Sequence, residues 1–376
     1  MKESFIAIAN GTVFTGDSMV NDKTVLIKDG RIVDLVRPAE VPGDADVFDA
    51  AGCYVAPGFI DLQVYGGGGQ LFSADPTAGA MDEIASALVE SGTTGFMITM
   101  ATNSMEVVDK ALEVLTFYQH EALLGLHLEG PYLNPSKRGA HPAEYIRNPD
   151  KVEIASLLAA AKGCLKMMTI APERFDAETL TLLLDAGVLL SAGHSNASYD
   201  EAMAGFSNGI RAVTHLFNAM SPFHHRNPGL PGAAFQTDQA CASIIADGIH
   251  VDYQVLSISK KLLGERMFLI TDAVTAVQVG TYTHVFQGDR YTLPDGTLSG
   301  SALTMMQAVA NCVRHAGIPL AEALRMASLY PASLIGAQAL GRVHAGTTAN
   351  LVVFDHHYAI KQVFLSGRPH KELRPY

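Results

Sequence analysis

The chain has 376 residues, of which 48% are hydrophobic and 17% are charged, and its formal net charge is −12. This length and apolar content allow a large buried core and exclude an intrinsically disordered protein, while no apolar stretch reaches the ~20 residues that a membrane-spanning helix needs. The acidic balance argues against a nucleic-acid-binding surface.

Short strands are expected at both ends of the chain. Residues 5–16 and 23–36 alternate apolar and polar side chains, and Asn10-Gly11 and Asp29-Gly30 are typical hairpin turns. The same pattern returns in residues 341–355 and 358–369. We therefore predict a small β-sandwich domain formed by residues 1–54 and 343–376, flanking a larger domain at 55–342.

Between these ends, short apolar strands alternate with amphipathic helices. The eight expected strands begin at Gly58, Gly92, Leu123, Leu165, Val188, Ala212, Cys241 and Met267. Such alternation indicates a parallel sheet with helical crossovers. Eight strands without a dinucleotide-binding glycine fingerprint favour a closed (β/α)₈ TIM-like barrel over a doubly wound open sheet. The helix after the sixth strand is weakly indicated, because residues 218–234 have the composition of a loop.

Four cysteines lie far apart along the chain, at Cys53, Cys164, Cys241 and Cys312. Unpaired spacing of this kind is typical of free core thiols in a reducing compartment and does not suit a cysteine-based zinc site. Residues 1–20 lack the apolar core of a signal peptide. We expect a cytoplasmic location.

Polar residues with catalytic potential gather at the carboxyl ends of the expected strands. They are Gln63, His127, Glu129, His194, His215, Asp247, His250 and Asp272. Active sites of barrels are built at this end, from several strands. Among them, Glu129, His194 and His215 offer one carboxylate and two imidazoles, a ligand set that suits Zn²⁺ or Fe²⁺ and leaves room for water. For His127, which shares a strand face with Glu129, the roles of ligand, orienting partner and core histidine stay open.

Asp272 follows the apolar run of residues 268–271. A buried carboxylate without a partner or a role would be costly, so we predict that Asp272 transfers protons next to a metal-activated water; a helix cap is the alternative.

His224, His225 and Arg226 lie in a loop rich in proline and glycine. Arginine suits bidentate binding of phosphate or carboxylate, and a solvated basic loop is the alternative. The glycines of residues 66–69 lack the ending of a P-loop.

Together, these motifs resemble one family. The segments "APGFIDLQVYGGGG", "LHLEGPYLNPSKRGAHP", "AGHSNASYDEA", "VTHLFNAM", "IADGIHVD" and "LITDAV" occur in the order found in the N-acetylglucosamine-6-phosphate deacetylases of the amidohydrolase superfamily. The resemblance runs from about Pro57 to Gly336. It implies metal-dependent hydrolysis of the acetamido group of N-acetyl-D-glucosamine 6-phosphate in amino-sugar catabolism. Metal-activated water would attack the amide carbonyl, with Asp272 as general base and then general acid.

The resemblance also implies roles for single residues. Those matching Glu129, His194 and His215 hold the metal, and the one matching His141 helps to polarise the amide carbonyl. Substrate contacts are implied for Ala140, His141, Asn218, Ala219, Arg226, His250, Leu303, Thr304 and Met305. Because the family is typically dimeric, Arg226 is expected to reach the active site of the neighbouring subunit.

One departure concerns the metal. Many amidohydrolases carry His-x-His at the end of the first barrel strand, where this chain has Gln63-Val64-Tyr65. Neither an amide nor a phenol replaces imidazole well, so Gln63 is interpreted as a vestigial metal position. We expect one divalent ion per subunit, with Zn²⁺ favoured over Fe²⁺, Co²⁺ or Mn²⁺.

Three alternatives stay open at this point. The "HHR" segment also resembles N-acetylgalactosamine-6-phosphate deacetylases, which leaves the sugar epimer less certain than the reaction. A cyclic amidase of the dihydroorotase type would need a carboxylated lysine late in the fourth strand, but Lys166 lies at its beginning. A barrel without catalytic activity would have no reason to keep three metal ligands and Asp272.

Overall fold

The computed structural model describes residues 5–276 and 282–370. Contacts between residues divide the chain into two compact units. The first unit consists of Met1–Asp61, Ala87–Gly95 and Met305–Tyr376, and the second of Leu62–Ser86 and Phe96–Thr304. The domain limits expected at residues 54 and 343 stay a prediction.

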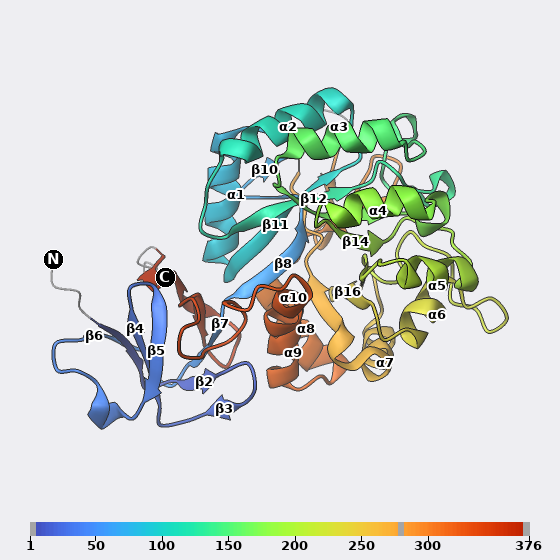
Figure 1. Cartoon of the computed structure of the whole chain (residues 1–376). Coiled ribbons are helices and arrows are strands. Elements are labelled where there is room, and N and C mark those ends of the chain that lie inside the picture. Colours follow the sequence, from blue (N-terminus) through green and yellow to red (C-terminus); the bar gives the residue numbers. More distant parts are fainter. Residues whose placement is uncertain (1–4, 277–281, 371–376) are drawn as a thin grey trace. The chain divides into compact units, whose positions relative to one another are not determined.

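The first unit contains two β-sheets, one built from N-terminal strands alone and one that combines strands from both ends of the chain (Figure 1). The four-stranded sheet has the order β5 (Arg31–Val36), β4 (Thr24–Lys28), β1 (Ile6–Ala9) and β6 (Asp46–Asp49). The six-stranded sheet has the order β23 (Arg368–Pro369), β22 (Ile360–Leu365), β21 (Leu351–Phe354), β7 (Tyr54–Pro57), β2 (Thr12–Phe14) and β3 (Met19–Val20). Side chains of both sheets share one buried core that includes Ile8, Val25, Val55 and Phe364. The predicted β-sandwich is therefore confirmed.

Of the two expected hairpin turns, one is confirmed and one is wrong. Asp29 and Gly30 have φ angles of 50° and 74° and join the antiparallel strands β4 and β5. The turn at Asn10-Gly11 is not a hairpin, because β1 pairs with β4 and β6 while β2 pairs with β3 and β7. It carries the chain from one sheet to the other. A Cβ atom on Gly11 would lie 2.8 Å from Val55 Cγ2, so the close approach requires glycine.

The eight-stranded sheet forms a parallel barrel whose members match the eight expected strands. They are β8 (Phe59–Val64), β11 (Thr93–Ala101), β12 (Leu123–Glu129), β13 (Leu165–Ile170), β14 (Leu189–Ala192), β15 (Ala212–Val213), β16 (Cys241–Ile245) and β17 (Met267–Ile270). Between its first and last strands, Val64 and Ala273 form a parallel bridge. The amide of Asp272 also donates to the carbonyl oxygen of Gln63 at 2.9 Å, and that of Tyr65 to Ala273 at 3.0 Å. These contacts close the barrel and confirm the predicted fold class.

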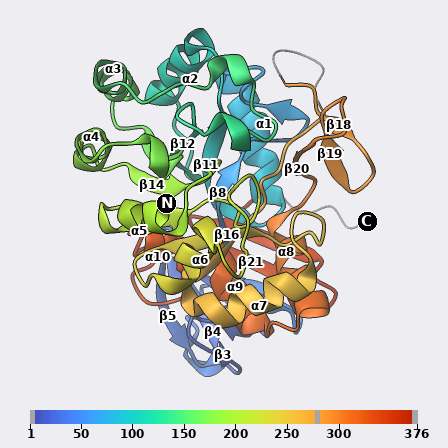
Figure 2. The ribbon, with the colours of Figure 1, turned by 90° about the vertical axis from the view of Figure 1, so that its right-hand side faces the viewer.

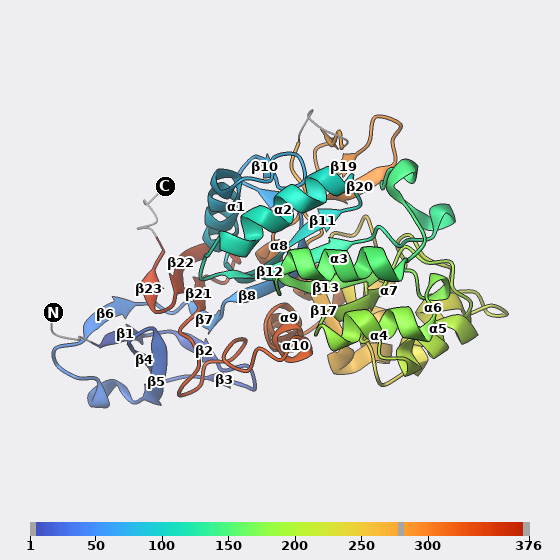
Figure 3. The same ribbon diagram turned by 45° about the horizontal axis from the view of Figure 1, so that its top comes forward.

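Helices follow most of the strands and surround the barrel (Figures 2 and 3). They are α1 (Ala78–Glu90), α2 (Met105–Phe117), α3 (Lys151–Ala161), α4 (Ala177–Asp185), α5 (Tyr199–Ser207), α6 (Gly229–Gln236) and α7 (Tyr253–Leu263). N-cap side chains such as Ser104, Asp150 and Ser198 accept backbone N–H groups at their first turns. The weakly indicated helix after the sixth strand is α6, which begins only after a loop of residues 217–228.

The remaining elements are short or belong to the first unit. The first unit holds α8 (Met305–Ala316), α9 (Leu320–Ala327) and α10 (Leu329–Leu334). After β17, an antiparallel sheet forms from β18 (Val285–Phe286), β19 (Arg290–Thr292) and β20 (Leu298–Ser301), and after β8 a small ribbon forms from β9 (Gly66–Gly67) and β10 (Gln70–Leu71). Across residues 5–276 and 282–370, no helix combines the length and apolarity that a membrane crossing requires.

Candidate metal centre and substrate cavity

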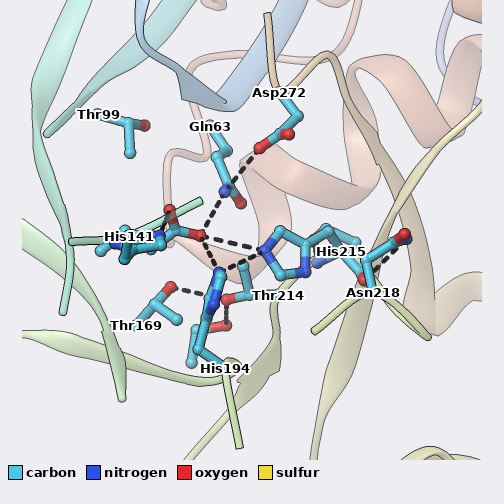
Figure 4. Close-up of polar contacts among 12 residues, drawn as sticks. Gln63, Thr99, His141, Thr169, His194, Thr214, His215, Asn218 and Asp272 are labelled. Carbon is cyan, nitrogen blue, oxygen red and sulfur yellow. Dashed lines mark hydrogen bonds and ion pairs between the residues drawn. The ribbon is translucent and has the colours of Figure 1, made fainter. Parts of the chain in front are cut away.

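Three predicted metal ligands meet at the carboxyl end of the barrel. Glu129 is the last residue of β12, and His194 and His215 each lie two residues beyond their strands, β14 and β15. The carboxylate oxygen Glu129 Oε1 lies 3.1 Å from His215 Nε2 and 3.3 Å from His194 Nε2. The two Nε2 atoms are 3.1 Å apart, and Figure 4 shows both rings pointing toward this common point.

The spacing and the protonation of these groups fit a divalent ion. Ligand atoms bound tetrahedrally at about 2.1 Å lie roughly 3.4 Å from one another, close to the three separations observed. The Nδ1–H of His194 donates to the carbonyl oxygen of Lys137 at 2.9 Å, which leaves the Nε2 lone pair directed at the centre. Burial opposes ionisation of Glu129, but the neighbouring His194 and His141 outweigh it and hold its pKa well below the ordinary value. The site therefore presents one carboxylate and two imidazole nitrogens.

His141 is a second imidazole neighbour of Glu129, and ligand atoms of Glu129, His141 and His194 lie within 4.8 Å of one another. Its hydrogen bonds distinguish it from a ligand. The backbone N–H of Thr102 donates to His141 Nδ1 at 3.2 Å, so the proton of the neutral ring lies on Nε2. That Nε2–H group donates to Glu129 Oε2 at 2.9 Å. His141 is therefore a hydrogen-bond donor at the edge of the centre, as its expected role requires.

Asp272 is connected to the metal centre through Gln63. It lies two residues beyond β17 and is 8% exposed. The side-chain amide nitrogen of Gln63 lies 2.9 Å from Asp272 Oδ1 and 2.9 Å from Glu129 Oε1 (Figure 4). At the position where many amidohydrolases carry a metal-binding histidine, the side-chain amide of Gln63 thus donates to the carboxylates of Glu129 and Asp272.

The backbone at three of these residues is left-handed. The φ angles are 47° at His194, 32° at His215 and 54° at Asp272. This conformation costs a residue with a Cβ atom about 1–2 kcal/mol and is concentrated at functional sites, where the surrounding structure enforces it. Here the short strands end before each residue, and the following bend directs its side chain over the mouth of the barrel.

A cavity of about 250 Å³ opens onto the metal centre. Its walls include Glu129, His194, His215, Asp272 and the residues expected to bind substrate, Ala140, His141, Asn218, Ala219 and His250. The structure therefore brings most of the predicted site residues to one place. The volume suits a small ligand of the size of a sugar phosphate rather than a polymer.

His250 is oriented by a carboxylate behind it. Its Nδ1 atom lies 2.6 Å from Asp247 Oδ2, and Asp247 Oδ1 accepts the backbone N–H groups of Ile249 and His250 at 2.9 Å. Burial alone would raise the pKa of Asp247, but the hydrogen bond and charge of His250, helped by the backbone donors, bring it below the ordinary value. The carboxylate of Asp247 therefore fixes the orientation of the His250 ring at the cavity wall.

Four expected substrate residues lie outside this cavity wall. Arg226 is exposed in the loop before α6. Leu303 and Thr304 follow β20 and are not among the residues that line the cavity. Met305 is the first residue of α8, in the other unit. Their roles in binding stay predictions.

His127 is a hydrogen-bonded histidine of the barrel interior. Its Nδ1–H donates to the carbonyl oxygen of Leu62 at 2.9 Å, so its Nε2 atom accepts from the hydroxyl of Thr169 at 2.8 Å. Both ring nitrogens are therefore occupied. Of the roles left open, the structure favours the core histidine over the ligand.

The sequence interpretation missed the cavity wall formed by the segment after β17. Tyr282, His284 and Ser299 line the cavity, and the hydroxyl of Tyr282 donates to the carbonyl oxygen of Thr102 at 2.7 Å. His284 Nδ1 lies 2.9 Å from Ser299 Oγ, and burial lowers the pKa of His284 to about 4. No motif marks Tyr282 or His284 in the sequence. Tyr65 was considered only as the replacement for the second histidine of His-x-His, although its place two residues after Gln63 indicates that both side chains share one face.

Comparisons with known proteins show the family to which the chain belongs. Residues 54–370 match the Amidohydrolase family. The N-acetylglucosamine-6-phosphate deacetylase of Haemophilus influenzae is 35% identical, with 96% of this chain and 98% of the relative covered. The N-acetylgalactosamine-6-phosphate deacetylase of Escherichia coli O157:H7 is 30% identical, with 95% and 97% covered.

Among solved structures, a mutant N-acetyl-D-glucosamine-6-phosphate deacetylase from Mycobacterium smegmatis, in complex with N-acetyl-D-glucosamine-6-phosphate, superposes with a TM-score of 0.90. It is 30% identical, and the match covers 98% of this chain and 99% of that one. The fold, the buried ligand set and these matches agree. The chain belongs to the amidohydrolase family, and within it to the family of the N-acetylglucosamine-6-phosphate deacetylases.

Proposed function

We propose that the protein hydrolyses the acetamido group of N-acetyl-D-glucosamine 6-phosphate to D-glucosamine 6-phosphate and acetate. The observation that carries the proposal is the convergence of Glu129, His194 and His215 with Asp272 at one end of a cavity of about 250 Å³. The galactosamine epimer is the second candidate, because a relative of similar coverage is named for it. The reaction would serve amino-sugar catabolism or the recycling of cell-wall sugars in the cytoplasm.

Glu129, His194 and His215 would hold one divalent ion per subunit, for which we propose Zn²⁺. The same donors accept Fe²⁺, Co²⁺ and Mn²⁺, so the donor set supports a divalent ion more strongly than one element. When bound, such an ion polarises a carbonyl group and lowers the pKa of water.

The chemistry of this chain's own residues follows from their hydrogen bonds. As water attacks the amide carbonyl carbon, Asp272 would accept a proton from it and then deliver that proton to the departing amine nitrogen. Gln63 holds Asp272 Oδ1 at 2.9 Å and so fixes the carboxylate for both transfers. His141 carries its proton on Nε2, and by turning this N–H from Glu129 Oε2 to the carbonyl oxygen it would stabilise the developing negative charge.

The opposite part of the cavity would hold the phosphate. The phosphate would contact the loop at Asn218 and Ala219 and the side chain of His250, all of which line the cavity, and Asp247 keeps His250 oriented. Arg226 is exposed and therefore available to a second subunit. We propose a homodimer in which Arg226 completes the phosphate site of the neighbour. Leu303, Thr304 and Met305 would contact the sugar.

The test is acetate release from both epimers. Metal-stripped protein receives one equivalent of Zn²⁺ or Fe²⁺, and Asp272→Asn serves as the inactive comparison. Metal-dependent turnover of N-acetyl-D-glucosamine 6-phosphate that Asp272→Asn abolishes would support the proposal. Faster turnover of the galactosamine epimer would favour the second candidate. A folded protein that binds metal but hydrolyses neither sugar would exclude both.

A further inference from the structure

Tyr65 is a buried residue of the cavity wall for which the proposed chemistry has no role. It follows the last residue of β8 and is 7% exposed. Its hydroxyl donates to Glu129 Oε2 at 2.5 Å, and its oxygen lies 2.8 Å from the side-chain nitrogen of Gln63. The phenol therefore contacts the proposed metal ligand Glu129 and the side chain of Gln63, and Gln63 and Tyr65 stand at the two positions where many amidohydrolases carry His-x-His.

The two oxygens of the Glu129 carboxylate have different surroundings. Oε1 faces the Nε2 atoms of His194 and His215 at 3.3 and 3.1 Å. Oε2 faces two hydrogen-bond donors, the hydroxyl of Tyr65 at 2.5 Å and the Nε2–H of His141 at 2.9 Å. A carboxylate oxygen with two donors has both of its lone pairs occupied. Only Oε1 is then directed at the metal centre.

Packing holds the phenol ring in this place. Tyr65 belongs to a buried apolar cluster with Leu71, Ala101, Val274 and Tyr282. Its backbone N–H donates to the carbonyl oxygen of Ala273 at 3.0 Å, which ties it to the barrel closure. The apolar cluster holds the ring, and the backbone hydrogen bond holds the main chain of Tyr65. The hydroxyl can therefore donate to Glu129 without a further loss of side-chain entropy, as in other preorganised sites.

We propose that Tyr65 is a positioning residue that makes Glu129 a one-oxygen ligand and so limits the centre to a single ion. The inference rests on the proposed function only in assuming that Glu129, His194 and His215 bind a divalent ion. By filling Oε2, the phenol removes the bridging oxygen that a second cation would need. The side-chain nitrogen of Gln63 lies 2.8 Å from the phenol oxygen and 2.9 Å from Oε1, so the amide packs against both groups.

The first test is the visible absorption spectrum of the Co²⁺-loaded protein. The visible absorption of a Co²⁺ ion weakens as the number of atoms that coordinate the ion rises. In Tyr65→Phe, Glu129 Oε2 loses a donor and becomes able to join the metal, so the absorption is expected to fall. Tyr282→Phe is the matched control, because it removes a buried hydroxyl from the same cluster that donates to the Thr102 carbonyl instead. An unchanged spectrum in Tyr65→Phe, or an equal change in both variants, would overturn the proposal.

The second test is the zinc-to-protein ratio at excess Zn²⁺. We expect one ion in the wild type and in Gln63→His, in which Tyr65 still covers Oε2, and two in the Gln63→His/Tyr65→Phe double variant. Two ions in Gln63→His alone, or one in the double variant, would contradict the role of Tyr65. Both measurements are independent of the substrate. A protein that binds one ion but hydrolyses neither sugar would therefore disprove the proposed function and leave the inference on Tyr65 standing.

Discussion

His194 Nδ1 donates to the carbonyl oxygen of Lys137 at 2.9 Å, which joins a metal ligand to the loop that follows β12. A second connection between the same loops runs through Glu173. Its Oε2 atom accepts from the hydroxyl of Ser195 at 2.6 Å, and its Oε1 atom accepts from the backbone of Asn196 at 2.7 Å and from the side chain of Asn134 at 2.9 Å. The orientation of His194 therefore depends on a carboxylate that does not touch the metal centre.

Substitution of Glu173 tests this dependence. Glu173→Gln keeps the shape of the side chain but replaces one acceptor oxygen by an NH2 donor. This NH2 group would face a hydrogen-bond donor of the neighbouring loops, so at least one of the present hydrogen bonds would be lost. We expect metal affinity to fall by about 10–100-fold, as for other partners that orient metal ligands. The measurement is competition for Zn²⁺ with a coloured chelator. Glu113→Gln, an exposed position on α2, is the control. Equal affinities of the two variants would show that Glu173 does not orient His194.

Asp272→Asn removes the proton acceptor and keeps a side chain of the same size beside Gln63. We expect kcat/KM to fall by about 10²–10⁴-fold, the range that general acid–base groups contribute. The metal-to-protein ratio should stay at the wild-type value, because Asp272 is not one of the three proposed ligands. Steady-state acetate release and metal analysis of the same sample check the two expectations. Loss of the metal in this variant would show that Asp272 is a ligand.

Removal of the metal should affect both activity and stability. Three buried ligand groups within 3.3 Å of one another lose the ion that balances them, so the apoprotein should unfold at a lower temperature. An ion present at 1,000 times its Kd stabilises the folded state by about 4 kcal/mol. Calorimetry before and after dialysis against chelator, and again after one equivalent of Zn²⁺, measures the change. Full activity after complete removal of the metal would refute the proposed centre.

His284 should make the protein sensitive to acid. Burial lowers its pKa to about 4 from an ordinary value of 6.5, so between these values the unfolded chain binds more protons than the folded one. The free energy of unfolding should therefore fall as the pH decreases from 6.5 to 4, by at most about 3 kcal/mol from this group. Urea denaturation at several pH values should show a flatter profile for His284→Gln. His225→Gln, at an exposed loop position, should retain the wild-type profile.

The barrel and its chemistry were predictable from different signals. The eight strands were found because buried parallel strands are short, apolar and separated by helices. Glu129, His194, His215 and Asp272 were predicted because each lies at the carboxyl end of such a strand or within two residues of it. The wall formed by Tyr282 and His284 could not be found, because it depends on how an irregular segment folds over the cavity and no local pattern encodes that contact.

The prediction of a hairpin at Asn10-Gly11 was wrong because strand pairing, like the cavity wall, depends on contacts that no local pattern encodes. The dipeptide correctly indicated a tight turn, and Asn10 has a φ of 59°. Whether the two strands beside a turn pair with each other depends on the other strands available. Here β4 and β6 pair with β1, while β3 and β7 pair with β2.

The left-handed backbone at His194, His215 and Asp272 has a consequence for protein engineering. Glycine is the residue that this conformation favours, so a thermostability screen run in the presence of chelator, where no ion stabilises the fold, should tend to enrich glycine at these positions. Such variants would gain backbone preference and lose the metal ligands and the proton acceptor. Selection for heat resistance without metal would therefore drive this barrel toward an inert scaffold, and any stabilised version should be screened with metal and substrate present.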